Sequence, residues 1–230
     1  ATAIQINGMD SDNGLFSNDS VTSSARPRFD ITGEKGQSVT VYIDGKYVET
    51  FTLATADAKY TVPDVLPDGS HSLRFEITDA AGNTAASNTK NFVIDTVNTT
   101  PIELTGINGE SVESITHNGV IYLSDLSRNA TLTGQAEAGS KMTILVNGLT
   151  VTEAWANADG VWSADIPQMV LRDGEMHFKF ISRDRGGNVN EATMTIVVDT
   201  RITTFSVDVQ DNKSSAADKW ALSTTTPTFF

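Results

Sequence analysis

A segment that occurs twice is the feature of this sequence that most limits what the chain can fold into. The segment from Asp68 to Asn83 begins with Asp-Gly and ends with Gly-Asn, and the same pattern recurs from Asp173 to Asn188. An Asp-Thr pair follows each copy, at Asp95 and again at Asp199. Internal repetition is the signature of a structural unit that is used more than once. We therefore expect tandem domains of one kind.

The repeat also predicts where the domains begin and end. We expect a first domain at 1–95, a second at 96–199, and the truncated start of a third at 200–230. The third is expected because the pattern of residues 26–29, with a Pro before an aromatic strand entry, returns at residues 226–229. The linkers contain no Gly/Ser-rich spacer, and short linkers of this kind are stiff.

Within each unit the hydrophobic residues alternate with polar ones. Val39, Val41 and Ile43 form one such run, and Met142, Ile144 and Val146 form its copy. A period of two indicates half-buried β-strands, and no segment sustains a helical stripe. Turn signals separate the runs, among them Asp44-Gly45, Asn147-Gly148 and Pro67-Asp68-Gly69. About seven short strands in about 100 residues predict an all-β chain of tandem immunoglobulin-like β-sandwiches.

Composition excludes several functions. The net charge of −13 disfavours nucleic acids and anionic membrane surfaces as partners, because both require a basic protein surface. The absence of cysteine excludes disulfides, thiolate catalysis and cysteine-ligated metals. No hydrophobic run reaches the length of a membrane span, so we expect no membrane insertion. The sequence carries none of the hydrolase, zinc-protease or phosphate-loop motifs, and we expect no enzymatic activity.

Aspartates gather where the predicted topology brings several chain segments to one end of the first sandwich. An immunoglobulin-like sandwich places its first interstrand loop, a later loop and the end of its last strand at one pole. The loop before the next domain's final strand faces that pole. Clustered carboxylates repel one another unless a cation neutralises them, and Ca²⁺ prefers oxygen ligands. We therefore predict calcium at this junction, with these ligand candidates: Asp10, Asp12, Asp68, Asp95, Asp184 and Asn188.

A second junction would lie after the second domain. Asp173 and Asp199 occupy there the positions that Asp68 and Asp95 occupy in the first domain. The region of residues 108–113 lacks the Asp-x-Asp pattern of the first domain, so we expect a weaker or differently built calcium site. The alternative for every one of these aspartates is a solvated turn that binds no metal.

The repeated pattern resembles the bacterial Ig-like repeats of giant type I-secreted adhesins. The resemblance rests on Asp68–Asn83 with residues 93–96, and on the weaker copy that ends at Thr200. It implies a linear rod of many domains with calcium at the borders, and export without cleavage of an N-terminal signal. It also implies a secreted or cell-surface location, a role in virulence, and attachment to a host glycan or protein. The chain would then be a monomeric fragment of a long protein.

Two other functions remain open at this stage. An exposed tryptophan in the second domain, Trp155 or Trp162, could stack on a sugar ring and make the chain a glycan-binding module. Burial in the core is the alternative for either tryptophan. The tandem domains could also be an accessory part of a secreted carbohydrate-active enzyme.

Overall fold

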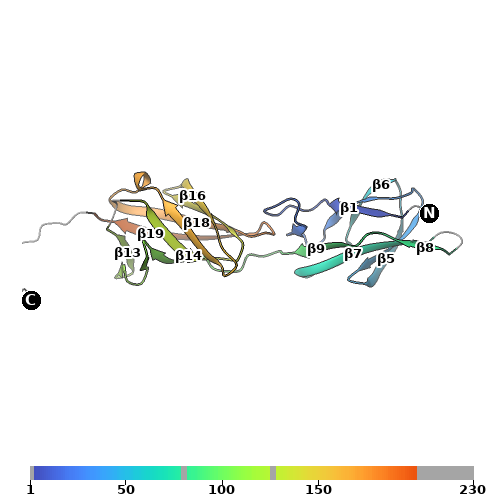
Figure 1. The fold of residues 1–230 in the computed structure, drawn as a ribbon, viewed down its shortest axis with the longest axis horizontal. Coiled ribbons are helices and arrows are strands. Elements are labelled where there is room, and N and C mark those ends of the chain that lie inside the picture. Colours follow the sequence, from blue (N-terminus) through green and yellow to red (C-terminus); the bar gives the residue numbers. More distant parts are fainter. Residues whose placement is uncertain (1–2, 79–81, 125–127, 201–230) are drawn as a thin grey trace, which may run out of the picture. The chain divides into compact units, whose positions relative to one another are not determined.

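Strands make up almost all of the regular structure in the computed structural model (Figure 1). It describes residues 3–78, 82–124 and 128–200, and residues 201–230 of the predicted third domain lie outside this part. The strands fall into two groups, β1–β9 and β10–β19, which we call the first and the second sandwich. Among the described residues there is no helix with the length and hydrophobicity of a membrane span.

The first sandwich is built from two sheets. One has the strand order β1-β3-β6, and the other has the order β2-β9-β7-β4-β5, with β8 paired to β7. Its strands are β1 (Gln5–Met9), β2 (Val21–Thr22), β3 (Arg28–Thr32), β4 (Ser38–Ile43), β5 (Lys46–Thr52), β6 (Asp57–Thr61), β7 (Gly69–Thr78), β8 (Thr84–Ala86) and β9 (Lys90–Ile94).

The second sandwich repeats this plan with the orders β11-β10-β14-β17 and β12-β13-β19-β18-β15-β16. A short 3₁₀ helix, η1 (Gln168–Val170), precedes β18. Its strands are β10 (Glu103–Ile107), β11 (Glu110–Ser111), β12 (Thr116–His117), β13 (Val120–Leu123), β14 (Ala130–Gln135), β15 (Lys141–Val146), β16 (Leu149–Trp155), β17 (Val161–Ile166), β18 (Gly174–Arg183) and β19 (Val189–Val198). The predicted fold class, tandem immunoglobulin-like sandwiches, is confirmed. The domain boundaries at 95/96 and 199/200 stay a prediction.

The beginning of each sandwich is shared between its two sheets. In the first sandwich β1 pairs antiparallel with β3, whereas β2 pairs parallel with β9, with Val21 opposite Val93. In the second sandwich β13 likewise pairs parallel with β19. The segment 10–20, which we call the 10–20 loop, therefore crosses from one sheet to the other near the end of β9. The crossing places the end of this loop beside the end of β9, since Val21 and Thr22 pair with Val93 and Ile94.

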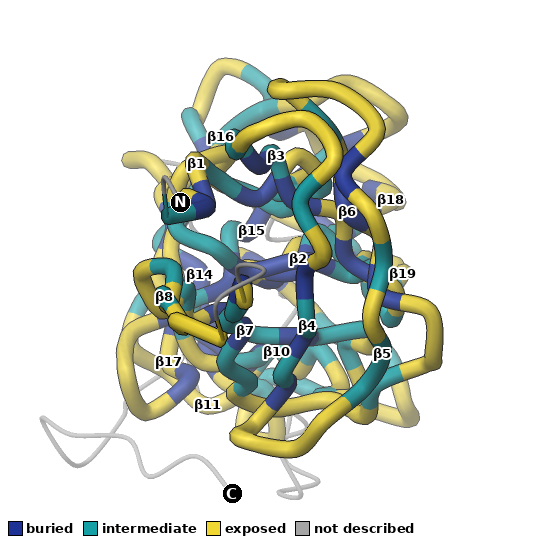
Figure 2. Tube along the Cα trace, turned by 90° about the vertical axis from the view of Figure 1, so that its right-hand side faces the viewer, coloured by how far each residue is buried: buried dark blue, intermediate teal, exposed yellow. Residues whose placement is uncertain are grey.

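The cores follow the alternation of the sequence. In β4 the side chains of Val39, Val41 and Ile43 are buried while their neighbours are not. Figure 2 shows the same pattern along the trace, with buried positions in the strands and exposed positions in the connecting loops. The predicted two-residue turns are also present, since Asp44 and Asn147 both have positive φ and each precedes a positive-φ glycine. Turns of this handedness match the twist of the strands they join.

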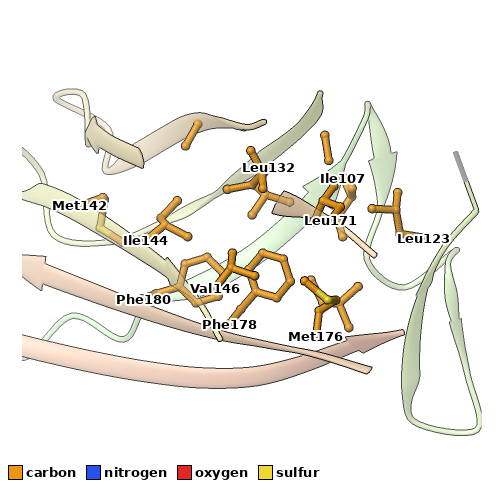
Figure 3. Close-up of a cluster of buried hydrophobic side chains, with 14 of the residues drawn as sticks. Ile107, Leu123, Leu132, Met142, Ile144, Val146, Leu171, Met176, Phe178 and Phe180 are labelled. Atoms are coloured by element: carbon orange, nitrogen blue, oxygen red, sulfur yellow. The ribbon is translucent and has the colours of Figure 1, made fainter. Parts of the chain in front are cut away.

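The core of the second sandwich centres on aromatic residues of β18. The rings of Phe178 and Phe180 stack with centroids 6.2 Å apart, and both lie beside Val146 between the sheets (Figure 3). Each large hydrophobic side chain buried in this way contributes about 1.5–3 kcal/mol. Residues of β18 and β19 belong to this core, which anchors the hairpin that presents the site described next.

Candidate metal centre

Three carboxylates from distant parts of the chain meet in one group. Asp95 follows β9, Glu137 lies between β14 and β15, and Asp184 follows β18. Each offers an oxygen atom, and these oxygens lie within 4.8 Å of one another. Asp184 is 1% exposed, and the other two side chains are half-buried. We call these three residues the carboxylate group.

The hairpin loop between β18 and β19, residues 184–188, fixes the position of Asp184. The carboxylate of Asp184 accepts hydrogen bonds from the backbone N–H of Asn188 at 2.8 Å and from its side-chain amide at 2.9 Å. The backbone N–H of Asp184 donates to the carbonyl of Asn188 at 3.1 Å. A short polar side chain that closes its own turn in this way is strongly oriented.

Asn188 also connects this loop to the first sandwich. Its side-chain amide donates to the carbonyl oxygen of Asp95 at 2.8 Å. The carboxylate of Asp95 accepts hydrogen bonds from the backbone N–H groups of Val97 and Gly186. A side chain on Gly186 would overlap the carbonyl oxygen of Asp95. The backbones of the two sandwiches are therefore in direct contact at this point.

The electrostatics of the carboxylate group favour a cation. Burial raises the pKa of Asp95, and the negative charges of Asp184 and Asp68 raise it further. Burial also raises the pKa of Glu137, and the charges of Asp184 and Asp95 add to that effect. In each case the ionised form is disfavoured by lost hydration and by like charge. Either a proton or a metal ion would relieve this repulsion.

Two more oxygen atoms are buried without a hydrogen-bond donor in the described part of the chain. They are Oδ1 of Asp12 and Oδ1 of Asn98. The other carboxylate oxygen of Asp12 accepts from the backbone N–H of Ser20 at 2.8 Å. Asn98 donates its amide to Ser182, two residues before Asp184. Buried oxygens without donors cost free energy unless a water or a cation satisfies them.

The structure gives the remaining predicted ligands different partners. Asp10 is paired with Arg28 and with Lys59, whose Nζ lies 2.7 Å away, so it faces cations of its own sheet. Hydrogen bonding to Lys59 lowers the pKa of Asp10, although burial opposes the change. Asp10 therefore lies outside the carboxylate group.

Asp68 and Asp173 occupy equivalent places in the two sandwiches. Asp68 accepts hydrogen bonds from the backbone and hydroxyl of Thr96, and Asp173 accepts the same pair from Thr200. Both aspartates therefore fix the chain just after the last strand. Asp199 is held there through its backbone N–H, which donates to the carbonyl of Leu123 at 3.0 Å.

Sequence reasoning missed Glu137 although a signal was present. Glu137 lies two residues before Gly139, just as Glu34 lies two residues before Gly36 in the first sandwich. The loop that carries Glu137 leads into β15, and Lys141 at the start of β15 pairs with Arg183 at the end of β18. This loop therefore lies at the same end of the sandwich as the 184–188 loop. The repeat alignment could therefore have added this acid to the predicted ligands.

The two tryptophans of the second sandwich have opposite environments. Trp162 is 1% exposed and belongs to the core. Trp155, at the end of β16, is 49% exposed and stacks on Phe16 of the 10–20 loop, with ring centroids 5.9 Å apart. Of the two, only Trp155 can reach a molecule outside the domain.

Comparison with known proteins identifies the family. The sequence model of the bacterial Ig-like domain family matches residues 2–96 and 127–200, so this chain belongs to that family. A search of curated proteins found no match.

Solved structures provide more distant similarities. The fibronectin(III)-like modules of Clostridium thermocellum CbhA are 14% identical and cover 90% of this chain and all of theirs, with a TM-score of 0.46. A Ca²⁺-stabilized, ice-binding adhesin of an Antarctic bacterium is 25% identical, covering 87% of this chain, with a TM-score of 0.40. A 1.5-MDa bacterial ice-binding adhesin is 22% identical over 87% of this chain and 66% of its own, with a TM-score of 0.37. The chain spans half the length of the Antarctic adhesin structure.

Proposed function

We propose that this chain is a structural repeat segment of a bacterial surface adhesin, in which Ca²⁺ links the two sandwiches through Asp95, Glu137 and Asp184. One observation carries the proposal. Carboxylates from both sandwiches come within 4.8 Å of one another, and the pKa values of two of them are raised. Groups brought together against their own repulsion indicate that a cation completes the arrangement.

The chemistry of the donors favours calcium over other metals. The group contains carboxylates only, and hard oxygen donors suit Ca²⁺ and Mg²⁺ rather than zinc or copper. Calcium takes six to eight oxygens and tolerates irregular geometry, whereas Mg²⁺ requires a small octahedron. Oδ1 of Asp12 and Oδ1 of Asn98 are also buried without a hydrogen-bond donor among the described residues, so either oxygen is available to a water or a cation.

Calcium would turn a repulsive contact into a stabilising one. Its positive charge would neutralise the carboxylates, and its ligands would come from both sandwiches. A metal present at 100 times its Kd adds about 2.7 kcal/mol to the stability of the state that binds it. In the millimolar calcium outside a cell this metal link would be formed, and where calcium is scarce the stabilisation that it adds would be lost.

The wider role follows from the family and the repeat pattern. Tandem bacterial Ig-like domains without an enzyme motif are suited to extend a surface protein away from the cell. We propose a secreted or surface location, export by type I secretion, a non-catalytic role, and attachment of the parent protein to host cells or other surfaces, with a role in virulence.

Calorimetric titration of the chain with CaCl₂ tests the metal centre. We expect at least one bound ion and a loss of at least tenfold in affinity for Glu137→Gln. Glu34→Gln is the matched control, because this exposed glutamate has the same place in the first sandwich. An absence of binding at millimolar calcium, or equal binding by both variants, would contradict the assignment. MgCl₂ in place of CaCl₂ tests the choice of metal.

The exposed ring of Trp155 favours glycan binding as a second candidate function. Its burial removes Trp162 from consideration. One face of Trp155 is covered by Phe16, so a sugar could stack only on the other face. Binding on a glycan array that is lost in Trp155→Ala would support this function, and an array without binding would remove it.

A further inference from the structure

The 10–20 loop contacts the second sandwich in a way that uses no carboxylate of the proposed calcium centre. Phe16 stacks on Trp155, with an angle of 5° between the ring planes. Arg185 donates from Nε and Nη2 to one carboxylate oxygen of Asp19, at 3.1 and 2.9 Å. The backbone N–H of Leu15 donates to the carbonyl of Arg185 at 3.0 Å. These contacts reach two separate parts of the second sandwich, the end of β16 and the 184–188 loop.

The backbones of the 10–20 loop and the 184–188 loop also lie close together, so the contact does not depend on side chains alone. A side chain on Gly14 would overlap the carbonyl oxygen of Arg185, and the Cα of Gly14 lies 3.2 Å from a side chain built on Gly187. Two glycines therefore allow the 10–20 loop and the 184–188 loop to fit against each other. Asp19 is further oriented by the backbone N–H of Val21, which donates to its other oxygen at 3.1 Å.

The residues that make this contact differ between the two sandwiches at equivalent positions. Trp155 lies opposite Lys141 at the end of the β15–β16 hairpin, and Thr52 lies opposite Ser38 at the same place in the β4–β5 hairpin. In the sequence repeat, Arg185 corresponds to Ala80. The first sandwich therefore lacks both the aromatic ring and the cation that the 10–20 loop contacts.

The loop itself is also particular to the first sandwich. The corresponding segment of the second sandwich, residues 108–119, contains no Phe, Tyr or Trp. It instead forms the short strands β11 and β12, which pair with β10 and β13. The second sandwich thus does not carry a copy of the 10–20 loop.

We propose that the 10–20 loop is a recognition element that selects which domain can follow the first sandwich. The partner it fits is a bacterial Ig-like domain with an aromatic residue at the Trp155 position and an arginine after the aspartate of its 184–188 loop. A second copy of the first sandwich, with Thr52 and Ala80 at these positions, does not fit. The order of domains is then encoded in side-chain pairs, and the pairing does not require metal.

Distance measurements between two spin labels test this inference in the full chain. The chain has no cysteine, so Tyr47→Cys and Met169→Cys introduce unique labelling sites, one in each sandwich, at residues that are 64% and 76% exposed. In EDTA we expect a narrow distance distribution for this labelled chain. Trp155→Thr with Arg185→Ala, which gives the second sandwich the residues of the first, should broaden it. An aromatic pair of this kind shifts the ratio of closed to open states by about 2- to 12-fold.

Exchange of charges provides the matched control. Asp19→Arg alone should broaden the distribution in EDTA, and addition of Arg185→Asp should narrow it again, because the ion pair is restored with reversed polarity. Circular dichroism of each variant shows whether both sandwiches are folded. A labelled chain that is already as broad in EDTA as the Trp155→Thr/Arg185→Ala variant would overturn the inference.

The same measurements separate this inference from the calcium proposal. If calcium neither binds nor changes any distribution, the calcium proposal fails, while the comparison of variants in EDTA still decides whether the loop selects its partner. If narrow distributions appear only after calcium is added, the recognition proposal fails and the calcium centre stands.

Discussion

At the scale of single residues, the contact between the two sandwiches depends on hydrogen bonds that fix the positions of a few side chains. The side-chain amide of Asn188 donates one hydrogen bond to the carboxylate of Asp184 and another to the backbone carbonyl of Asp95 in the first sandwich. Asp95 accepts backbone N–H groups from its own linker and from the facing loop. Asp95 and Asp184 are therefore held in place by hydrogen bonds of the protein itself. Preorganisation of this kind reduces the cost of ordering ligands when the ion binds.

Gly186→Ala tests this close contact. The added methyl group would overlap the carbonyl oxygen of Asp95, so the 184–188 loop has to move. Overpacking of this kind costs about 1–3 kcal/mol. We expect weaker calcium binding by calorimetry, with unchanged circular dichroism. Gly8→Ala is the control, because a side chain there meets no atom within 4 Å. Equal calcium affinity for both variants would show that the loops are not in contact.

His71 provides a second residue-scale test, through pH. Its Nδ1 lies 2.7 Å from a carboxylate oxygen of Asp44 and its Nε2 lies 2.9 Å from the carbonyl of Pro67, so both ring nitrogens face acceptors. Burial alone would lower the pKa of His71, but these hydrogen bonds and the charge of Asp44 outweigh it and raise the pKa. Only the protonated ring carries an N–H on both nitrogens, so only this form can donate to both acceptors.

The sign of the pH effect follows from the raised pKa. The folded state binds the proton more tightly than the unfolded state, so the stabilisation is complete below a pH of about 6.5 and is lost as the pH rises through the folded pKa. Chemical denaturation in EDTA between pH 6 and 9 should show this decrease. Asp44→Asn should flatten it, while Asp57→Asn, an exposed aspartate of the same sandwich, should leave it unchanged. A slope that persists in Asp44→Asn would assign the titration to another group.

At the scale of elements, alternation and turn chemistry made the strands predictable. Val39, Val41 and Ile43 repeat with period two, and β4 buries these three. Contacts between distant segments were harder to predict. Asp10 was predicted as a calcium ligand from its place in the sequence alone, which did not reveal that the pairing of β1 with β3 and of β3 with β6 brings Arg28 and Lys59 beside it. Register decides such neighbours, and the period of a single strand does not reveal register.

Phe180→Ala tests the core of the second sandwich as an element. Phe180 is fully buried and packs against Phe178 and Trp162. Removing a buried phenyl ring costs about 3–5 kcal/mol, because a cavity remains where the ring was. Urea unfolding should register this loss, whereas Leu149→Ala, at a side chain that is 73% exposed, should change stability by less than about 0.5 kcal/mol. A small effect of Phe180→Ala would indicate that the sheets do not pack as described.

At the scale of the described chain, two sets of side chains at the contact between the sandwiches respond differently to conditions. The carboxylate group opposes closure unless a cation neutralises it, since burial and like charge raise the pKa values of Asp95 and Glu137. The pairs Phe16–Trp155 and Asp19–Arg185 favour closure with or without metal. The sequence repeat predicted Asp95 and Asp184, but the pairs were not predictable, because they lie where the two copies differ.

Asp95→Asn should therefore change stability in opposite directions with and without calcium. In EDTA the variant removes a charge that is disfavoured by burial and by the nearby Asp184 and Asp68, so its unfolding midpoint should rise. In saturating calcium the variant lacks a proposed metal ligand, so its free energy of unfolding should be about 2–3 kcal/mol below that of the parent chain. Glu175→Gln, an exposed acid of the second sandwich, should show neither effect. Thermal unfolding in the two buffers measures both signs, and a variant that is less stable in both would mean that Asp95 acts in closure without metal.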